Sequence, residues 1–450
     1  MSTLRSASPA HNTTHLMAVA FGLVVCVAAA WAHEEHAEHA ERPFTAREQH
    51  RPTPLPDRVV LTWSADPTTS IDVSWRTDTT VDESVAEFAR ADRLQGNLRD
   101  RVRHAMRVDG AHEKFTSDLG ACRMHSVRLE NLDPATMYAY RVGDGEEHWS
   151  EWFQFRTASA ADDPFTFVYF GDAQNSVRSL WSRVIREANQ HAPRAAFMLH
   201  AGDLINNDER DAEWGEWFGA GGWLNGMIPV IATPGNHEYD DDRISKHWRP
   251  QFAFPLNGPP GLEESVYWID YQGARIISLN SNERIDEQCD WLRSVLSDSR
   301  RPRWTIVTFH HPIYSSSRDR DNPELRAAWR PILEEHGVDL VLQGHDHSYA
   351  RSGLGGPTNV AEGVRHASGN TVFVVSVSGP KMYASQERWK FARQASGVQL
   401  FQVIRVSPQQ IRYEARLATG ELYDTFTLEK ATDGKTTMIE QDPPSAEIRK

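Results

Sequence analysis

The chain has 450 residues, 40% hydrophobic and 24% charged, so it is long enough for two or more domains that each bury a core. Its formal net charge of −14 argues against a nucleic-acid partner, because such recognition needs a basic face to neutralise phosphates. A small anionic substrate stays compatible with this charge, since bound cations would dominate the local field at a site.

The N-terminus is typical of an export signal. Arg5 lies in a polar region ahead of an apolar stretch over 16–31, and Ala30-Trp31-Ala32 fits a cleavage site. We expect residues 1–32 to be a signal peptide cleaved near Ala32, which would make the protein secreted or periplasmic, without stable membrane insertion. An uncleaved anchor is the alternative, because a spanning helix needs at least about 17 residues.

Residues 33–54 are rich in His, Glu and Pro and predict a polar linker. Residues 55–158 predict an all-β domain, because Ile71, Val73 and Trp75 alternate with polar residues, as in half-buried antiparallel strands. The segment 132–142 is similar to the turn and strand of a fibronectin type III sandwich, in which a Tyr ties a corner to the backbone.

Residues 164–430 alternate strand and helix patterns. Short apolar runs occur at 165–170, 195–199, 227–232, 275–279, 304–309 and 338–342. Apolar residues at helical spacing occupy 177–188 and 285–296. This order predicts an α/β layered domain, in which ligands collect beyond the carboxyl ends of the strands. Residues 431–450 predict a disordered tail.

Two cysteines, Cys122 and Cys289, would remain after signal cleavage. They fall in different predicted domains, so an interdomain disulfide and two buried free thiols are both compatible with the sequence.

Five short segments place polar side chains directly after apolar runs. They are FGDAQ (170–174), AGDLINND (201–208), PGNHE (234–238), FHHP (309–312) and QGHDH (343–347). One copy of Gly-Asp or Gly-His would indicate only a turn. The set supplies carboxylate, amide and imidazole groups, which suit Zn, Fe or Mn. It therefore predicts a binuclear metal site built from Asp172, Asp203, Asn236, His310, His345 and His347.

The order of these motifs resembles the calcineurin-like metallophosphoesterases and, within them, the purple acid phosphatases. The resemblance implies an N-terminal fibronectin type III-like sandwich followed by a four-layer αββα catalytic domain, with two metal ions between facing sheets. By position it implies that Asp203 bridges two ions. One ion would be held by Asp172, Asp203 and His347, and the other by Asp203, Asn236, His310 and His345; His310 rather than His311 is the ligand by resemblance alone.

One position departs from the family. Purple acid phosphatases place a Tyr three residues after the bridging Asp, where its phenolate binds Fe(III) and gives the colour, whereas this chain has Asn206. Asn206 or Gln174 is a candidate to complete the first ion's ligands, and both could instead hydrogen-bond to ligands. A neutral amide stabilises the ferric state less than a phenolate, so we expect divalent ions and no purple colour.

The chemistry follows from what two cations do to water. They lower the pKa of a coordinated water toward about 7, and the resulting hydroxide can attack a phosphoryl group. His237 resembles the family's acid for the leaving alcohol, although it could instead only orient Glu238 or the metal ligands. A second family His is replaced by Arg320, in a charged stretch over 318–321 for which a solvated loop is the favoured interpretation.

We therefore expect a metal-dependent, acid phosphatase-like hydrolase that cleaves small phosphomonoesters. A phosphodiesterase with the same site is the nearest alternative. An alternative of another class is a non-catalytic exported binding protein with a structural metal site, which the full set of ligands disfavours.

Overall fold

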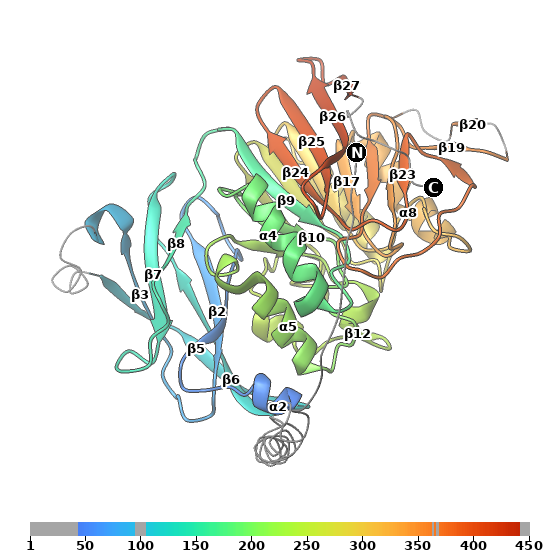
Figure 1. Ribbon diagram of the computed structural model, residues 1–450. Helices are drawn as coiled ribbons and strands as arrows, with labels where there is room; N and C mark the ends of the chain where they lie inside the picture. Colours follow the sequence, from blue (N-terminus) through green and yellow to red (C-terminus); the bar gives the residue numbers. More distant parts are fainter. Residues whose placement is uncertain (1–43, 95–104, 362–363, 366–368, 442–450) are drawn as a thin grey trace, which may run out of the picture. The chain divides into compact units, whose positions relative to one another are not determined.

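The computed structural model describes residues 44–94, 105–361, 364–365 and 369–441 (Figure 1). The predicted signal peptide and the first part of the predicted linker lie outside these residues. Within the linker, the short helix α2 (Ala46–Gln49) begins after Thr45, whose Oγ1 accepts a hydrogen bond from Glu48 N while Glu48 Oε2 accepts one from Thr45 N. None of the described helices combines the length and apolar character needed to cross a bilayer.

Residues 57–156 form a sandwich of two four-stranded antiparallel sheets, ordered β1-β2-β6-β5 and β4-β3-β7-β8. The strands are β1 (Asp57–Thr62), β2 (Ile71–Thr77), β3 (Val85–Arg90), β4 (Met106–Asp109), β5 (Ala111–Ser117), β6 (Gly120–Leu129), β7 (Met137–Gly143) and β8 (Phe153–Arg156), with a 3₁₀ turn at η1 (Ala91–Leu94). Tyr138 Oη accepts a hydrogen bond from Asp133 N at 2.9 Å, which ties the corner before β7 to the backbone. The fibronectin type III assignment of this sandwich stays a prediction.

The expectation that the strand at 71–77 is half-buried is wrong. Every residue of β2 is buried, including Asp72, Ser74 and Arg76 on its polar face. This face is covered because it packs toward the following domain, where Arg76 Nη1 lies 3.2 Å from Asp211 Oδ2. Arg58 also donates to Asp211, with Nη1 2.6 Å from Oδ1. A polar strand face can therefore be buried when ion pairs satisfy its charged groups.

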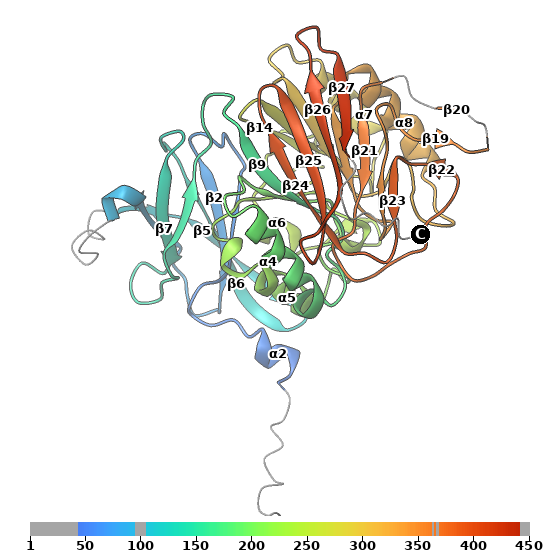
Figure 2. The same cartoon turned by 45° about the horizontal axis from the view of Figure 1, so that its top comes forward.

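The rest of the chain contains two seven-stranded sheets (Figures 1 and 2). The first has the order β11 (Val230–Ala232), β10 (Met198–His200), β9 (Phe165–Phe170), β24 (Leu400–Val406), β25 (Gln410–Leu417), β26 (Leu422–Lys430) and β27 (Thr436–Gln441). The second has the order β14 (Tyr267–Tyr271), β15 (Ala274–Ser278), β16 (Trp304–Thr308), β17 (Leu340–Gln343), β21 (Val372–Val375), β18 (Tyr349–Arg351) and β23 (Arg393–Ala395). Smaller pairings join β12 (Tyr239–Asp240) to β13 (Arg243–Ile244), and β19 (Thr358–Asn359) to β20 (Val364–Arg365) and β22 (Trp389–Lys390).

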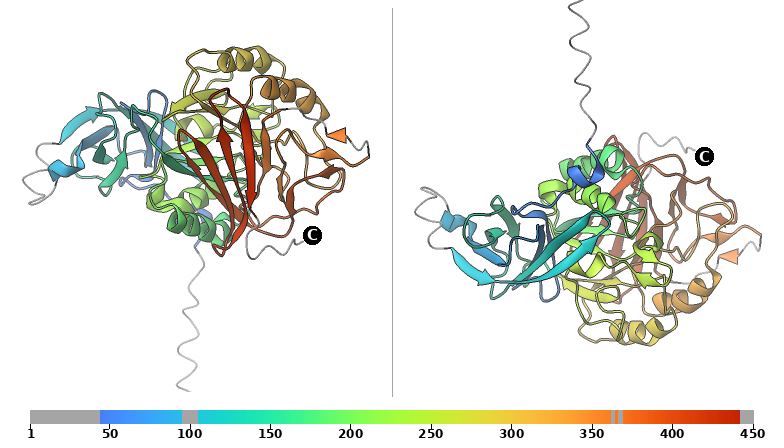
Figure 3. Two further views of the ribbon diagram at one scale, coloured as in Figure 1. Left: turned by 90° about the horizontal axis from the view of Figure 1, so that it is seen from above. Right: turned by 90° about the horizontal axis from the view of Figure 1, so that it is seen from below.

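Helices cover the outer faces of both sheets. They are the π-helical turn η3 (Val177–Trp181), α4 (Ser182–His191) and α5 (Asp211–Gly221) on one side, and α7 (Glu287–Leu296) and α8 (Pro323–Glu335) on the other. The short helix α6 (Trp248–Gln251) lies against β2 and β6 instead, and 3₁₀ turns occur at η4 (Gly222–Leu224) and η5 (Asn236–Glu238). In Figure 3 the green helices and the yellow to orange helices lie on opposite sides of the strands.

Alternation along the second sheet explains this layering. Ile276 and Ile306 belong to the large core shared with the first sheet, whereas Ile277 and Val307 pack into the core under α7 and α8. Neighbouring residues on a strand point to opposite faces, so each strand contributes side chains to two cores. The order of layers is helix, sheet, sheet, helix, and the predicted fold class is confirmed.

One further expectation is corrected. The tail predicted to be disordered from residue 431 contains β27, which pairs with β26 from Thr425↔Gln441 to Lys430↔Thr436; residues 442–450 lie outside the described part of the chain. Of the two alternatives that the sequence left open for the cysteines, the structure has free thiols, with Cys122 buried and Cys289 partly buried. Cys122 packs in a small cluster with Phe115 and Met124.

Candidate metal centre

The polar motifs follow the carboxyl ends of strands in both sheets. Asp172, Asp203 and Asn236 come after β9, β10 and β11, which are mutually parallel. His310 and His345 come after β16 and β17, which are also parallel. Since the carboxyl ends of parallel strands share one edge of a sheet, these side chains meet where the two sheets face each other.

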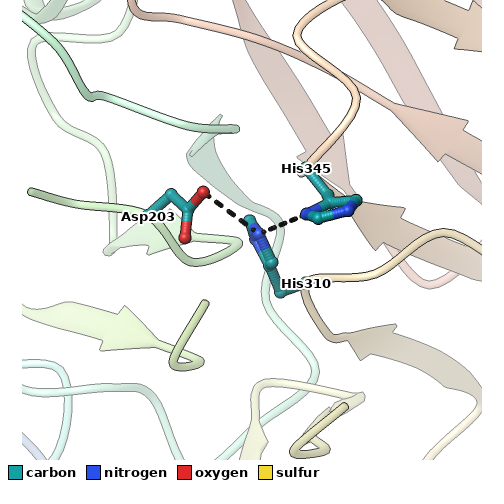
Figure 4. A group of neighbouring side chains, drawn as sticks. All are labelled: Asp203, His310 and His345. Atoms are coloured by element: carbon teal, nitrogen blue, oxygen red, sulfur yellow. Dashed lines mark hydrogen bonds and ion pairs between the residues drawn. The ribbon is translucent and has the colours of Figure 1, made fainter. Parts of the chain in front are cut away.

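One group of side chains gathers around His310 (Figure 4). His310 Nε2 lies 3.2 Å from Asp203 Oδ2, 3.1 Å from His345 Nδ1 and 3.1 Å from Asn236 Oδ1. Asn236 Oδ1 also lies 2.9 Å from His345 Nδ1. Four potential ligand atoms therefore converge on one point, and His310 and Asp203 are fully buried beneath it.

A second group shares Asp203. Ligand atoms of Asp172, Asp203 and His347 all lie within 4.8 Å of one another, with Asp172 Oδ2 3.2 Å from His347 Nε2. Among the described residues, Asp172 Oδ2 is buried without a hydrogen-bond partner. A buried carboxylate oxygen left unpaired is costly, and a cation would satisfy it. The donor set thus fits two cations with Asp203 between them, although the ligand roles stay a prediction.

Gln174 and Asn206, the two candidates to complete the group of Asp172, Asp203 and His347, differ in position. Gln174 is fully buried, with Nε2 2.6 Å from Asp203 Oδ2 and 3.4 Å from His347 Nε2. Its Oε1 has no partner among the described residues. The side-chain oxygen of Asn206 instead accepts a hydrogen bond from Asn175 Nδ2. The structure therefore brings Gln174 among the clustered ligand atoms, while the amide oxygen of Asn206 is already engaged.

Hydrogen bonds fix which ring nitrogen faces each group. His310 Nδ1 lies 2.9 Å from the carbonyl oxygen of Ala201, and His347 Nδ1 lies 3.0 Å from that of Lys381. A carbonyl only accepts, so each Nδ1 carries the hydrogen and each Nε2 is turned toward the carboxylates. His311, the neighbouring imidazole, is held by Ser281, with Nδ1 2.9 Å from Oγ. The structure thus places His310, and not His311, beside Asp203.

The charges in this cluster strongly perturb one another. Burial raises the pKa of Asp172 to about 7, with His310 opposing and Asp203 reinforcing the change. Burial alone would lower the pKa of His310, but Asp203 raises it to about 9. Burial and then the charge of Lys381 lower the pKa of His347 to about 3. Protons therefore compete with cations for Asp172 and His310, because a metal ligand binds in its unprotonated form.

The backbone is bent to bring the ligands inward. Asp203, His345 and His347 adopt left-handed φ angles of 52°, 74° and 47°. Such angles are uncommon outside glycine and persist where surrounding structure enforces them, often at functional sites. A Cβ atom at Gly235 would collide with the Asp203 carboxylate, and one at Gly344 with the Asp172 carboxylate. The glycines of the PGNHE and QGHDH motifs therefore allow the loops to approach the carboxylates closely.

Glu238 is a positioning residue that the sequence analysis missed. Its Oε2 accepts hydrogen bonds from Asp203 N at 2.8 Å and Gly235 N at 2.7 Å. Its Oε1 accepts them from Leu204 N at 2.8 Å and Ile205 N at 3.3 Å. The carboxylate therefore joins the loop that carries Asp203 to the turn that carries Asn236. The sequence feature that could have revealed this role is the position of Glu238 three residues after Gly235, which is the spacing of a capping box.

Comparison with known proteins identifies two domains in the chain. The calcineurin-like phosphoesterase family matches residues 165–349, and the family described as purple acid phosphatase, N-terminal domain, matches residues 56–157. The chain contains a calcineurin-like metallophosphoesterase domain and a purple acid phosphatase N-terminal domain. The resemblance inferred from the order of the motifs is confirmed.

Several proteins similar to this chain carry phosphatase names. It is 28% identical to purple acid phosphatase 18 of Arabidopsis thaliana over 51% of the chain and 53% of that protein. It is 27% identical to acid phosphatase type 7 of Homo sapiens over 67% of the chain and 71% of that protein. The chain thus spans about half the length of the plant relative. Purple acid phosphatase PPD1 from yellow lupin seeds shares its fold, with a TM-score of 0.69 and 18% identity over 84% of this chain and 75% of that one.

Proposed function

We propose that the protein is a metal-dependent phosphoric-ester hydrolase that acts on small phosphomonoesters. The observation that carries this proposal is the sharing of Asp203 between two groups of ligand atoms. When bound, two cations would supply a coordinated water of lowered pKa and would offset the charge of the phosphoryl oxygens. Iron, zinc or manganese suits the ligands Asp172, Asp203, His347, Asn236, His310 and His345.

An open cavity beside the group around His310 supports a catalytic rather than a purely structural site. The cavity has a volume of about 500 Å³ and is lined by Asn236 and His311, together with Tyr239, Ser281 and Asn282. Asn236 is exposed although its amide oxygen lies among the buried ligand atoms. A site kept only for folding is usually closed, whereas a catalytic site keeps an accessible position.

His237 is our candidate for the acid that protonates the leaving alcohol. Its Nδ1 lies 2.6 Å from the carbonyl oxygen of Asn206, so Nδ1 carries a hydrogen. Its backbone N donates to Asp203 Oδ1 at 3.0 Å, which fixes the residue beside the shared carboxylate. Nε2 would then hold and deliver the proton. Asn206 supports this role through its carbonyl, which orients the imidazole.

The direct test of the proposed function joins metal analysis with phosphate release. We expect protein as purified to contain about two metal ions, to hydrolyse 4-nitrophenyl phosphate, and to lose this activity on chelation and regain it with added metal. Hydrolysis of bis(4-nitrophenyl) phosphate, which has the same leaving group, measures the diesterase alternative. Protein that binds metal yet hydrolyses neither ester contradicts the proposed function and supports a non-catalytic role.

The assignment of His237 has its own test. We expect His237→Ala to retain metal and to lose turnover most on esters with poor leaving groups, because these need the proton most. His191→Ala, on the surface of α4 and paired with Glu187, is the matched control. Parental rates of the His237 variant on all esters would contradict the assignment.

A further inference from the structure

Arg320 is fixed beside both groups of ligand atoms. Its Nη1 donates to the backbone carbonyl of His345 at 2.8 Å. Its guanidinium carbon lies 4.7 Å from the centre of the Tyr383 ring, and that ring lies 4.7 Å from the ring of His347. One hydrogen bond and one cation–π contact therefore hold the guanidinium at the backbone of His345 and on Tyr383, the ring that packs against His347.

The neighbouring acids offset the positive charge of Arg320 only in part. Asp321 is occupied by Arg326 and Arg388, each with a nitrogen 2.6 Å from a carboxylate oxygen. Within the described residues, Asp346 is the one carboxylate within ion-pair distance of Arg320, with Oδ1 3.8 Å from Nη1. The side chain of Arg320 is 31% exposed. A loop expected to be solvated therefore contains one arginine that makes no close ion pair and lies beside the metal centre, where it donates to the His345 carbonyl.

The donors of Arg320 are only partly used. Of its nitrogens, Nη1 makes the contact with His345, and in the part of the chain that the structure describes neither Nε nor Nη2 donates to a protein acceptor. A planar guanidinium with free N–H groups matches two oxygens of a phosphate better than a lysine ammonium does. The unused donors suit an anionic ligand brought to the adjoining metal centre.

We propose that Arg320 binds a non-bridging oxygen of the phosphoryl group and thereby selects monoesters over diesters. The inference rests on the proposed function and names a specificity residue for it. A monoester dianion presents three non-bridging oxygens and two negative charges. A diester presents two such oxygens and one charge, and its second alcohol group stands where the extra oxygen would be. Arg320 thus gains an acceptor with the monoester that the diester lacks.

The test compares substrates with one leaving group. We expect Arg320→Ala to lower kcat/KM for 4-nitrophenyl phosphate by about 10- to 100-fold, the value of a hydrogen bond to a charged group. For bis(4-nitrophenyl) phosphate we expect kcat/KM to fall by less than about threefold, because the diester lacks the third non-bridging oxygen that Arg320 would bind. Arg320→Lys should recover part of the loss, since it restores the charge without the planar fork. Arg318→Ala removes the same charge from an exposed neighbour in the loop and should change neither value.

Binding of orthophosphate to the metal-loaded protein gives a readout that needs no turnover. Arg320→Ala should weaken this binding by the same factor as the monoester kcat/KM, with metal content and melting temperature unchanged. An equal loss on both esters, or parental orthophosphate affinity in Arg320→Ala, would overturn the proposal. If the parent protein hydrolyses neither ester, the proposed function fails, and the orthophosphate measurement still decides whether Arg320 binds phosphate.

Discussion

Replacement of Glu238 by Gln tests whether one buried carboxylate holds the metal centre together. The two oxygens of Glu238 accept four backbone N–H groups, two on each oxygen. In Glu238→Gln, either amide orientation replaces one oxygen with an NH₂ group, so two buried N–H donors lose their acceptor. Each buried unsatisfied donor costs about 1–3 kcal/mol, which gives a loss of about 2–6 kcal/mol in the free energy of unfolding.

The measurement combines urea unfolding with metal titration of the folded variant. We expect the midpoint of unfolding to fall and metal affinity to weaken, because the loop of Asp203 is no longer tied to the turn of Asn236. Glu187→Gln, on the surface of α4, is the matched control and should change stability by no more than about 0.5 kcal/mol. If Glu238→Gln unfolds at the parental urea concentration and binds metal as tightly as the parent, the positioning role is wrong.

Three other predictions concern the ion-pair interface, acid stability and the metal. Asp211→Asn should lower the free energy of unfolding by about 3–5 kcal/mol in urea denaturation, because it leaves the buried Arg58 without its counter-ion, whereas Asp290→Asn, at a 99% exposed carboxylate, should have little effect. Burial lowers the pKa of His200 from 6.5 to about 3, so between these pH values the unfolded chain binds a proton that the folded protein does not. The contribution of neutral His200 to the free energy of unfolding is therefore fully present above pH 6.5 and is lost as the pH falls toward 3. His200→Phe should therefore reduce the fall in melting temperature between pH 7 and pH 4, and an unchanged fall would contradict this account. Metal-replete protein should show no intense visible charge-transfer band, because Asn206 stands where a phenolate would bind Fe(III), and a purple preparation would refute this.

The strands that carry the metal centre were predictable from sequence because they are short apolar runs followed at once by polar ligands. The run at 165–170 coincides with β9, and the runs at 275–279 and 304–309 differ from β15 and β16 by one residue. The run at 227–232 overestimates β11, because the chain before Pro229 is still completing a turn in which Ile228 N donates to Leu224 O. Hydrophobicity identifies buried residues, but it does not separate a strand from the buried turn that enters it.

Other features depend on contacts between distant segments and were not accessible to local patterns. The burial of the polar face of β2 needs Asp211, which lies 135 residues beyond Arg76. The ordering of Thr436–Gln441 needs the open edge of β26. Resemblance selected His310 over His311, and only the hydrogen bond from His310 to the Ala201 carbonyl gives a physical reason for that choice. The role of Glu238 likewise appears only when its backbone partners are known.

The position of β9 has a consequence for how this protein is made. The strand β9 leads directly to Asp172. It pairs with β10 on one side and with β24 on the other, from Val406↔Phe165 to Gln402↔Tyr169. During synthesis the segment that forms β9 leaves the ribosome more than 200 residues before β24 does. Until then its edge has no native partner and is open to pairing with other nascent chains. A polypeptide stopped before residue 400 would hold all six clustered Asp, Asn and His residues and still lack the strand that completes the sheet beneath them.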